Sequence, residues 1–289
     1  MSIRTLLILI VTLPALLLAG ALALGIKIPV PQFGRDYVLS FLLSPDEVSV
    51  QLPDVAGPDD DGRPLVVIDA GHGGRDPGSV SGGVNEKDIV LAVSLALRDA
   101  LLADGGIRVA MTRDDDVIVP LGNRPEIARQ LEADLFISIH ADSAGDASEV
   151  SGASVYTLSS EASSEAAARF AARENNADSV NGIEIEGQSE EVSAILVELS
   201  QARTQEDAAE FSSLIVREGE GKLRFHPSAR RSAALAVLRA PDVPAVLFES
   251  GFVTNEGDRA RLTTEEGRAQ YAEVLARAIR VYFARRSET

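Results

Sequence analysis

From residue 65 onward, short apolar runs alternate along the chain with stretches that carry apolar residues at helical spacing. Residues 65–68 and 135–140 have the composition or the alternation of buried strands, whereas residues 86–103 and 265–284 have the periodicity of helices. Such an order is typical of a layered α/β domain. We therefore predict a single three-layer α/β domain with a mostly parallel or mixed central sheet flanked by helices, preceded by an N-terminal hydrophobic segment.

The N-terminal segment, residues 1–26, carries Arg4 and then an apolar run whose length is close to the ~20 residues that span a bilayer. Small residues at 19–23 resemble a cleavage site, so the segment is predicted to be a signal peptide or a membrane anchor. We expect an exported protein of the periplasm or cell envelope, touching the membrane only through residues 1–26. The proline-rich residues 27–63 are predicted to be a linker, and residues 64–286 the catalytic domain.

Composition narrows the chemistry that this domain can perform. The formal net charge of −17 comes from acids spread along the chain, which argues against a nucleic-acid partner. The absence of cysteine excludes disulfides, thiolate zinc sites and cysteine nucleophiles. A metal ion would need His, Asp or Glu ligands, and the chain has only three histidines, namely His72, His140 and His226.

Three polar residues fall at or just beyond the carboxyl ends of predicted strands: His72, His140 and Glu249. Open α/β sheets bind their ligands at that edge. A fourth residue, Glu86, begins the helix that follows the first strand. Two imidazoles and one carboxylate form a catalytic zinc site with an open position for water, and the remaining carboxylate, Glu249, is free to act as a base.

Each of these residues also has a structural interpretation when it is taken alone. Glu86 could complement the helix dipole, His140 could close a strand, and His72 could serve the glycine turn around it. Glu249 could be a buried carboxylate paired with an arginine such as Arg124. The occurrence of all four at one predicted edge favours the functional interpretation.

Five stretches of the sequence, in order, resemble the zinc N-acetylmuramoyl-L-alanine amidases of the amidase 3 type, which are cell-wall amidases of cell separation. They are VIDAGHGGRDPG (67–78), NEKD (85–88), NR (123–124), DLFISIHAD (134–142) and PAVLFESGFVTN (244–255). The resemblance covers about residues 64–284. It implies one zinc ion per chain, with His72, Glu86 and His140 as its ligands and Glu249 as the catalytic carboxylate.

The resemblance also implies a substrate and a reaction. The substrate would be peptidoglycan, cut at the amide bond between N-acetylmuramic acid and L-alanine of the stem peptide by zinc-activated water, in cell-wall remodelling and daughter-cell separation. Asp69 and Ser138 are expected to orient the ligands. Arg124 would either clamp a substrate carboxylate or pair with a buried acid. His226 lies outside every matching stretch and is expected to be structural.

Some members of this family carry a helix that plugs the zinc groove until an activator protein withdraws it. Residues 189–199 resemble that element, so Glu190 or Glu191 is predicted to cover the metal from a regulatory insertion at 183–223. The alternative is an ordinary surface helix with solvated acids.

Three other functions remain open at the level of sequence. The chain could be a different zinc hydrolase, such as a carboxypeptidase or a deacetylase, or a non-catalytic wall-binding protein that kept the fold. Serine hydrolysis is disfavoured because no Gly-x-Ser-x-Gly motif is present.

Overall fold

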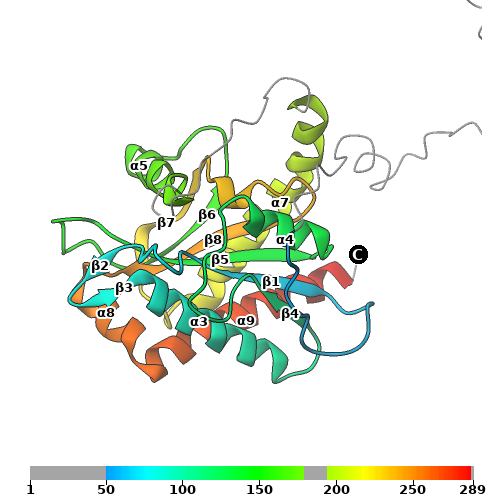
Figure 1. The fold of residues 1–289 in the computed structure, drawn as a ribbon, viewed down its shortest axis with the longest axis horizontal. Helices are drawn as coiled ribbons and strands as arrows, with labels where there is room; N and C mark the ends of the chain where they lie inside the picture. The colour runs from blue at the N-terminus through cyan, green and yellow to red at the C-terminus, as the bar shows by residue number, and fades with distance from the viewer. Residues whose placement is uncertain (1–49, 179–193, 288–289) are drawn as a thin grey trace, which may run out of the picture. The chain divides into compact units, whose positions relative to one another are not determined.

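A six-stranded mixed sheet, with strand order β4-β1-β5-β8-β6-β7, forms the centre of the domain in the computed structural model (Figure 1). Four neighbouring strands, β4, β1, β5 and β8, are parallel to one another; β6 is antiparallel to β8, and β7 is parallel to β6. The strands are β1 (Leu65–Ala70), β4 (Arg108–Met111), β5 (Leu135–Asp142), β6 (Ala153–Leu158), β7 (Phe225–Ala233) and β8 (Ala245–Phe252). The predicted α/β domain with a mixed sheet is confirmed.

The structure describes residues 50–178 and 194–287; for residues 194–202 it describes the backbone only. A small hairpin, β2 (Val80–Ser81) and β3 (Val84–Asn85), precedes the first helix, and a short 3-10 helix, η1, covers Ala236–Leu238. The α-helices are α3 (Glu86–Leu102), α4 (Asn123–Gln130), α5 (Glu165–Glu174), α7 (Ala194–Gly219), α8 (Glu256–Thr263) and α9 (Glu265–Ser287).

Helices cover both faces of the sheet and bury two apolar layers (Figure 1). One layer lies under α3, α7 and α9 and includes Ile68 and Ile137; the other lies under α4 and α5 and includes Val67 and Phe136. Neighbouring residues of a strand point to opposite faces of the sheet. Since helices cover both faces, β1 and β5 are buried on both sides and are apolar almost throughout.

The edge strand β7, which includes His226, is not predicted by the sequence pattern. Its residues are polar and it includes Pro227. An edge strand tolerates both features, since one side of its backbone needs no strand partner, and most residues of β7 are partly or fully exposed. The strand signal is therefore weak where the sheet ends.

Part of the predicted linker belongs to the domain. Val50 is buried, and Ala56 exchanges two backbone hydrogen bonds of 2.8 and 2.9 Å with Val109 on β4. Residues 1–26, for which membrane insertion was predicted, lie outside the described residues. Among the helices that the structure describes, none combines the length and the apolar character needed to cross a membrane.

The predicted regulatory insertion, residues 183–223, is only partly described. Glu190 and Glu191 lie outside the described residues. Within α7, Phe211, Leu214 and Ile215 are buried in the layer shared with α9. This part of the insertion is a core helix of the domain and not a surface helix.

Candidate metal centre and active site

The strand register brings four of the predicted site residues to one face of the sheet. Asp69 on β1 is the partner of Ser138 on β5, and His140 on β5 is the partner of Glu249 on β8. Since side chains two residues apart share a face, all four project toward the face that α4 and α5 cover. Glu249 lies within β8, which continues past the predicted strand end at Glu249 to Phe252.

His72 follows β1 in a glycine-rich turn and has a positive φ of 58°. Its Nδ1 lies 2.8 Å from Oδ2 of Asp76, a residue for which no role was predicted. A carboxylate that accepts the Nδ1 proton of a histidine leaves Nε2 as the free ligand atom. The Nε2 of His72 is buried and makes no hydrogen bond within the described part of the chain.

Glu86 is the first residue of α3, and its buried carboxylate lies between the two histidines. Oε1 is 3.1 Å from Nε2 of His72 and 3.2 Å from Nδ1 of His140. The same oxygen accepts a hydrogen bond from the amide of Ala141, and Oε2 accepts one from the amide of Ser79. The helix start and these two amides fix the carboxylate in place.

Charges at this cluster are strongly coupled. Burial acts to raise the pKa of Glu86, but the nearby His72 charge and a hydrogen bond from His140 outweigh it and hold that pKa well below its usual range. Burial likewise acts to lower the pKa of His72, but the Glu86 charge and the bond to Asp76 raise it well above its usual range. Without a metal ion, these shifts favour an ionised Glu86 carboxylate beside a protonated His72 imidazole.

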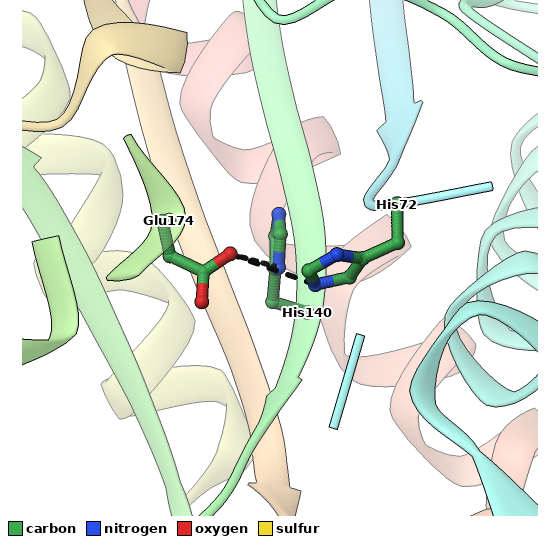
Figure 2. Close-up of side chains that lie close together, drawn as sticks. All are labelled: His72, His140 and Glu174. Atoms are coloured by element: carbon green, nitrogen blue, oxygen red, sulfur yellow. Dashed lines mark ion pairs between the residues drawn. The ribbon is translucent and has the colours of Figure 1, made fainter. Parts of the chain in front are cut away.

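A third carboxylate completes the cluster and was not predicted. Glu174, the last residue of α5, points its carboxylate at both histidines (Figure 2). Its Oε2 lies 3.5 Å from Nε2 of His72 and 3.4 Å from Nδ1 of His140. A signal was present in the sequence: Phe170 and Ala171 are buried on α5, and Glu174 follows them at helical spacing, so it lies on the same buried face.

His72, His140 and Glu174 each offer one buried atom that could bind a metal ion, and these three atoms lie within 4.8 Å of one another. The distances between these histidine nitrogens and the oxygens of Glu86 and Glu174 run from 3.1 to 3.5 Å. Zinc bonds of about 2.0–2.1 Å in a tetrahedron place neighbouring ligand atoms about 3.3–3.5 Å apart. Two imidazole nitrogens and two carboxylate oxygens, from His72, His140, Glu86 and Glu174, therefore lie together as possible metal ligands.

Glu249 is separate from this cluster and has a different environment. Its side chain is 0% exposed, and neither oxygen finds a hydrogen-bond partner among the described residues. Burial, followed by the negative charges of Asp142, Glu86 and Glu174, raises the pKa of Glu249 well above its usual range. A carboxyl group of this kind is suited to exchange a proton near neutral pH.

The structure decides between the two interpretations of Arg124. Its Nη1 lies 2.8 Å from Oδ1 of Asp69, so it pairs with a buried acid, and its Nη2 donates to the carbonyl of His72 at 2.7 Å. Ser138 donates to the other oxygen of Asp69 at 2.6 Å. Asp69 and Ser138 therefore reach His72 through Arg124 and the backbone, and not through the imidazole rings.

His226 lies on β7, where its Nδ1 accepts a hydrogen bond from the amide of Ser228 and contacts Arg231. Burial and the Arg231 charge lower its pKa. It has no carboxylate contact within the described residues, in keeping with the structural role expected for it.

An α/β domain that holds two histidines and a glutamate at one sheet edge, with a second glutamate buried beside them, has the architecture of a metal-dependent hydrolase. The family model for N-acetylmuramoyl-L-alanine amidase, Amidase_3, matches residues 66–281, and the chain belongs to that family.

Individual proteins agree with this assignment. The chain is 37% identical to the amidase AmiC of Neisseria meningitidis, over 76% of this chain and 53% of that protein, so it spans about half the length of that relative. It is 36% identical to AmiA of Escherichia coli, over 77% of each chain. Among solved structures it is similar to AmiC2 of Nostoc punctiforme, with a TM-score of 0.55, 29% identity, and coverage of 76% of this chain and 97% of that one.

Proposed function

We propose that the protein is a zinc-dependent N-acetylmuramoyl-L-alanine amidase, which hydrolyses the bond between N-acetylmuramic acid and L-alanine in peptidoglycan. The single observation that carries the proposal is the cluster of His72, Glu86 and His140, in which one glutamate oxygen lies 3.1 and 3.2 Å from two histidine nitrogens. These residues would hold one zinc ion per chain. Membership of the amidase family supports the choice of substrate.

A zinc ion at this cluster would supply Lewis acidity, lowering the pKa of a water molecule and polarising the carbonyl of the scissile amide. Glu249 provides the proton transfer. It accepts a proton from the attacking water and delivers it to the nitrogen of L-alanine as the carbon–nitrogen bond breaks. Its burial next to His140 keeps its pKa high enough for both steps.

The proposal is tested by incubating the purified protein with isolated sacculi, with and without a chelator. We expect release of intact stem peptides and free glycan strands, lost with chelator and restored by zinc. Shortened peptides would instead indicate a carboxypeptidase, and released acetate a deacetylase. If the protein binds zinc but shows no turnover, and the variant Glu174→Ala shows none either, the result would indicate a wall-binding protein.

We further propose that the enzyme is autoinhibited, with Glu174 occupying the fourth corner of the metal site. The C-terminal end of α5 is attached around that site at several points. Arg173 contacts Asp142 at 2.7 Å, and Asn175 exchanges hydrogen bonds of 2.8 Å with the backbone of Ala234 and Ala236. An activator protein that withdrew this end would open the corner to water.

The setting of this activity is also a proposal. We infer export to the periplasm or cell envelope through residues 1–26, and a role in cell-wall remodelling and daughter-cell separation. The prediction that Glu190 or Glu191 covers the metal from the insertion at 183–223 remains a second proposal for the inhibitory contact, beside Glu174. Imaging the protein fused to a fluorescent reporter in dividing cells tests whether it lies in the cell envelope at the division site.

A further inference from the structure

Arg113 is a buried cation that the reaction proposed above does not use. It lies just after the edge strand β4, and its side chain is 3% exposed. Its guanidinium donates only to backbone carbonyls: Nε to Ala70 at 2.9 Å, Nη1 to Asp115 at 2.9 Å, and Nη2 to Gly71 at 2.7 Å and Lys87 at 3.0 Å. The described residues provide no carboxylate within ion-pair distance.

Two of these carbonyls adjoin the predicted metal ligands. Gly71 immediately precedes His72, and Lys87 immediately follows Glu86. One nitrogen, Nη2 of Arg113, therefore ties together the backbone beside both residues. His72 and Glu86 come from a turn and from a helix start, and this nitrogen is a direct link between the two.

The turn that carries His72 needs such a support. A positive φ is uncommon for a residue other than glycine and costs about 1 kcal/mol or more. Arg113 and Arg124 together hold the carbonyls of Ala70, Gly71 and His72. Arg124 forms an ion pair with Asp69, whereas Arg113 has no ion pair among the described residues and is stabilised by Asp69, Asp116 and Asp88 only at longer range.

Burying a cation that has no ion pair costs free energy, and the hydrogen bonds from Arg113 to four backbone carbonyls offset part of that cost. Burial, followed by repulsion from Arg124, lowers the pKa of Arg113 to about 10, which still leaves it charged at neutral pH. A guanidinium has five donors fixed in one plane, so it can donate to four carbonyls from one position. A lysine ammonium at this distance would serve fewer of them.

We propose that Arg113 is a positioning residue that fixes the separation of His72 and Glu86, so that the metal site is formed before the ion arrives. This inference rests on the proposed zinc chemistry. If Arg113 has this role, the turn that carries His72 and the start of α3 at Glu86 are ordered in the metal-free protein.

The test compares zinc affinity in the wild type, Arg113→Lys and Arg108→Lys, measured by competition with a chromophoric chelator. Arg108 is the matched control because it begins β4, the strand that Arg113 follows, and its side chain donates three hydrogen bonds, all to Asp61 and Arg63. We expect Arg113→Lys to bind zinc about 10–100-fold more weakly, as is usual when a residue supporting metal ligands is lost. Arg108→Lys should bind as the wild type does.

A second readout is the visible absorption spectrum of the cobalt-substituted protein, which reports ligand geometry independently of turnover. Arg113→Lys should change the spectrum, and Arg108→Lys should leave it unchanged. Wild-type zinc affinity and an unaltered cobalt spectrum in folded Arg113→Lys, checked by circular dichroism, would overturn the proposal.

Hydrogen exchange in the metal-free wild type covers the case in which Arg113→Lys does not fold. The amides of Gly73, Asp76, Glu86 and Lys87 are hydrogen bonded within the turn and helix start. We expect them to be protected without metal; rapid exchange that slows only when zinc is added would assign the ordering to the ion and sink the inference. This experiment remains decisive even if the wild type binds no zinc, an outcome that would refute the proposed function instead.

Discussion

His140 on β5 and Glu249 on β8 are register partners on neighbouring parallel strands, yet they belong to different parts of the site. The Nδ1 of His140 faces Glu86 and Glu174, whereas both oxygens of Glu249 lack hydrogen-bond partners among the described residues. One residue of the pair is therefore placed to hold a metal and the other to exchange a proton. The two functions should be separable by mutation.

Glu249→Gln should keep its zinc and lose its turnover. The amide has the same shape as the carboxyl group but cannot accept the proton of the attacking water, and loss of a general base typically costs about 10²–10⁴-fold in rate. Zinc content by elemental analysis and hydrolysis of sacculi measure the two effects. Glu218→Gln is the control, since this buried acid lies on α7 and pairs with Arg217; a wild-type rate for Glu249→Gln would exclude the role.

The same substitution should change how stability depends on pH in metal-free protein. Burial and neighbouring acids raise the pKa of Glu249, so the folded state keeps a proton that the unfolded chain loses above about pH 4.3. Between these two pKa values the free energy of unfolding falls with rising pH, by up to about 1.4 kcal/mol per unit. Glu249→Gln escapes this loss.

Urea unfolding in the presence of a chelator, from pH 4 to pH 8, measures this effect. The stability of Glu249→Gln relative to the wild type should be lowest near pH 4 and should increase toward neutral pH. A difference that stays constant over this range would mean that Glu249 titrates as an ordinary exposed acid.

Removal of a predicted zinc ligand should act on metal binding itself. His72→Ala and His140→Ala each delete one nitrogen of the cluster, and the loss of affinity should exceed the roughly 10–100-fold that follows loss of a supporting residue. His226→Ala removes the third histidine, which lies on β7 and contacts Arg231, and should retain full zinc content. Equal zinc content in all three variants would contradict the assigned ligand set.

The sequence predicts the fold where the apolar pattern is strong. Strands β1, β5 and β8 are buried on both faces, so their residues are apolar almost throughout and stand out. Strand β7 lies at the sheet edge, where polar residues and Pro227 remove that signal. The same limit applies to residues 50–56, because the pairing of Ala56 with Val109 depends on an edge that exists only in the folded sheet.

The site shows the same division. His72, Glu86 and His140 could be predicted because each lies near a strand end or a helix start that the sequence marks, and Glu249 because it follows the apolar run of β8. Glu174 and Arg113 could not, since neither lies in a recognisable motif and both act through tertiary contacts. The helical spacing of Glu174 from Phe170 and Ala171 marks it as buried, but does not indicate what it faces.

Release of α5 provides the last prediction. Glu174 occupies a corner that water would need, and Arg173 holds the end of the helix to Asp142 at 2.7 Å. Glu174→Ala should therefore raise basal hydrolysis of sacculi, by about 10-fold if closure is worth about 1.4 kcal/mol. Arg173→Ala should give a smaller increase, because an ion pair with an exposed arginine is screened by solvent.

Variants of other acids in the same region separate a specific contact from a general loss of negative charge. Glu165→Ala removes an acid from the exposed first turn of α5 and should leave the basal rate unchanged. Glu190→Ala and Glu191→Ala test whether these residues also cover the metal. An increase confined to those two variants would move the inhibitory contact to residues 183–199, whereas an increase in Glu174→Ala alone would place it at the end of α5, where the Glu174 carboxylate lies 3.5 Å from Nε2 of His72.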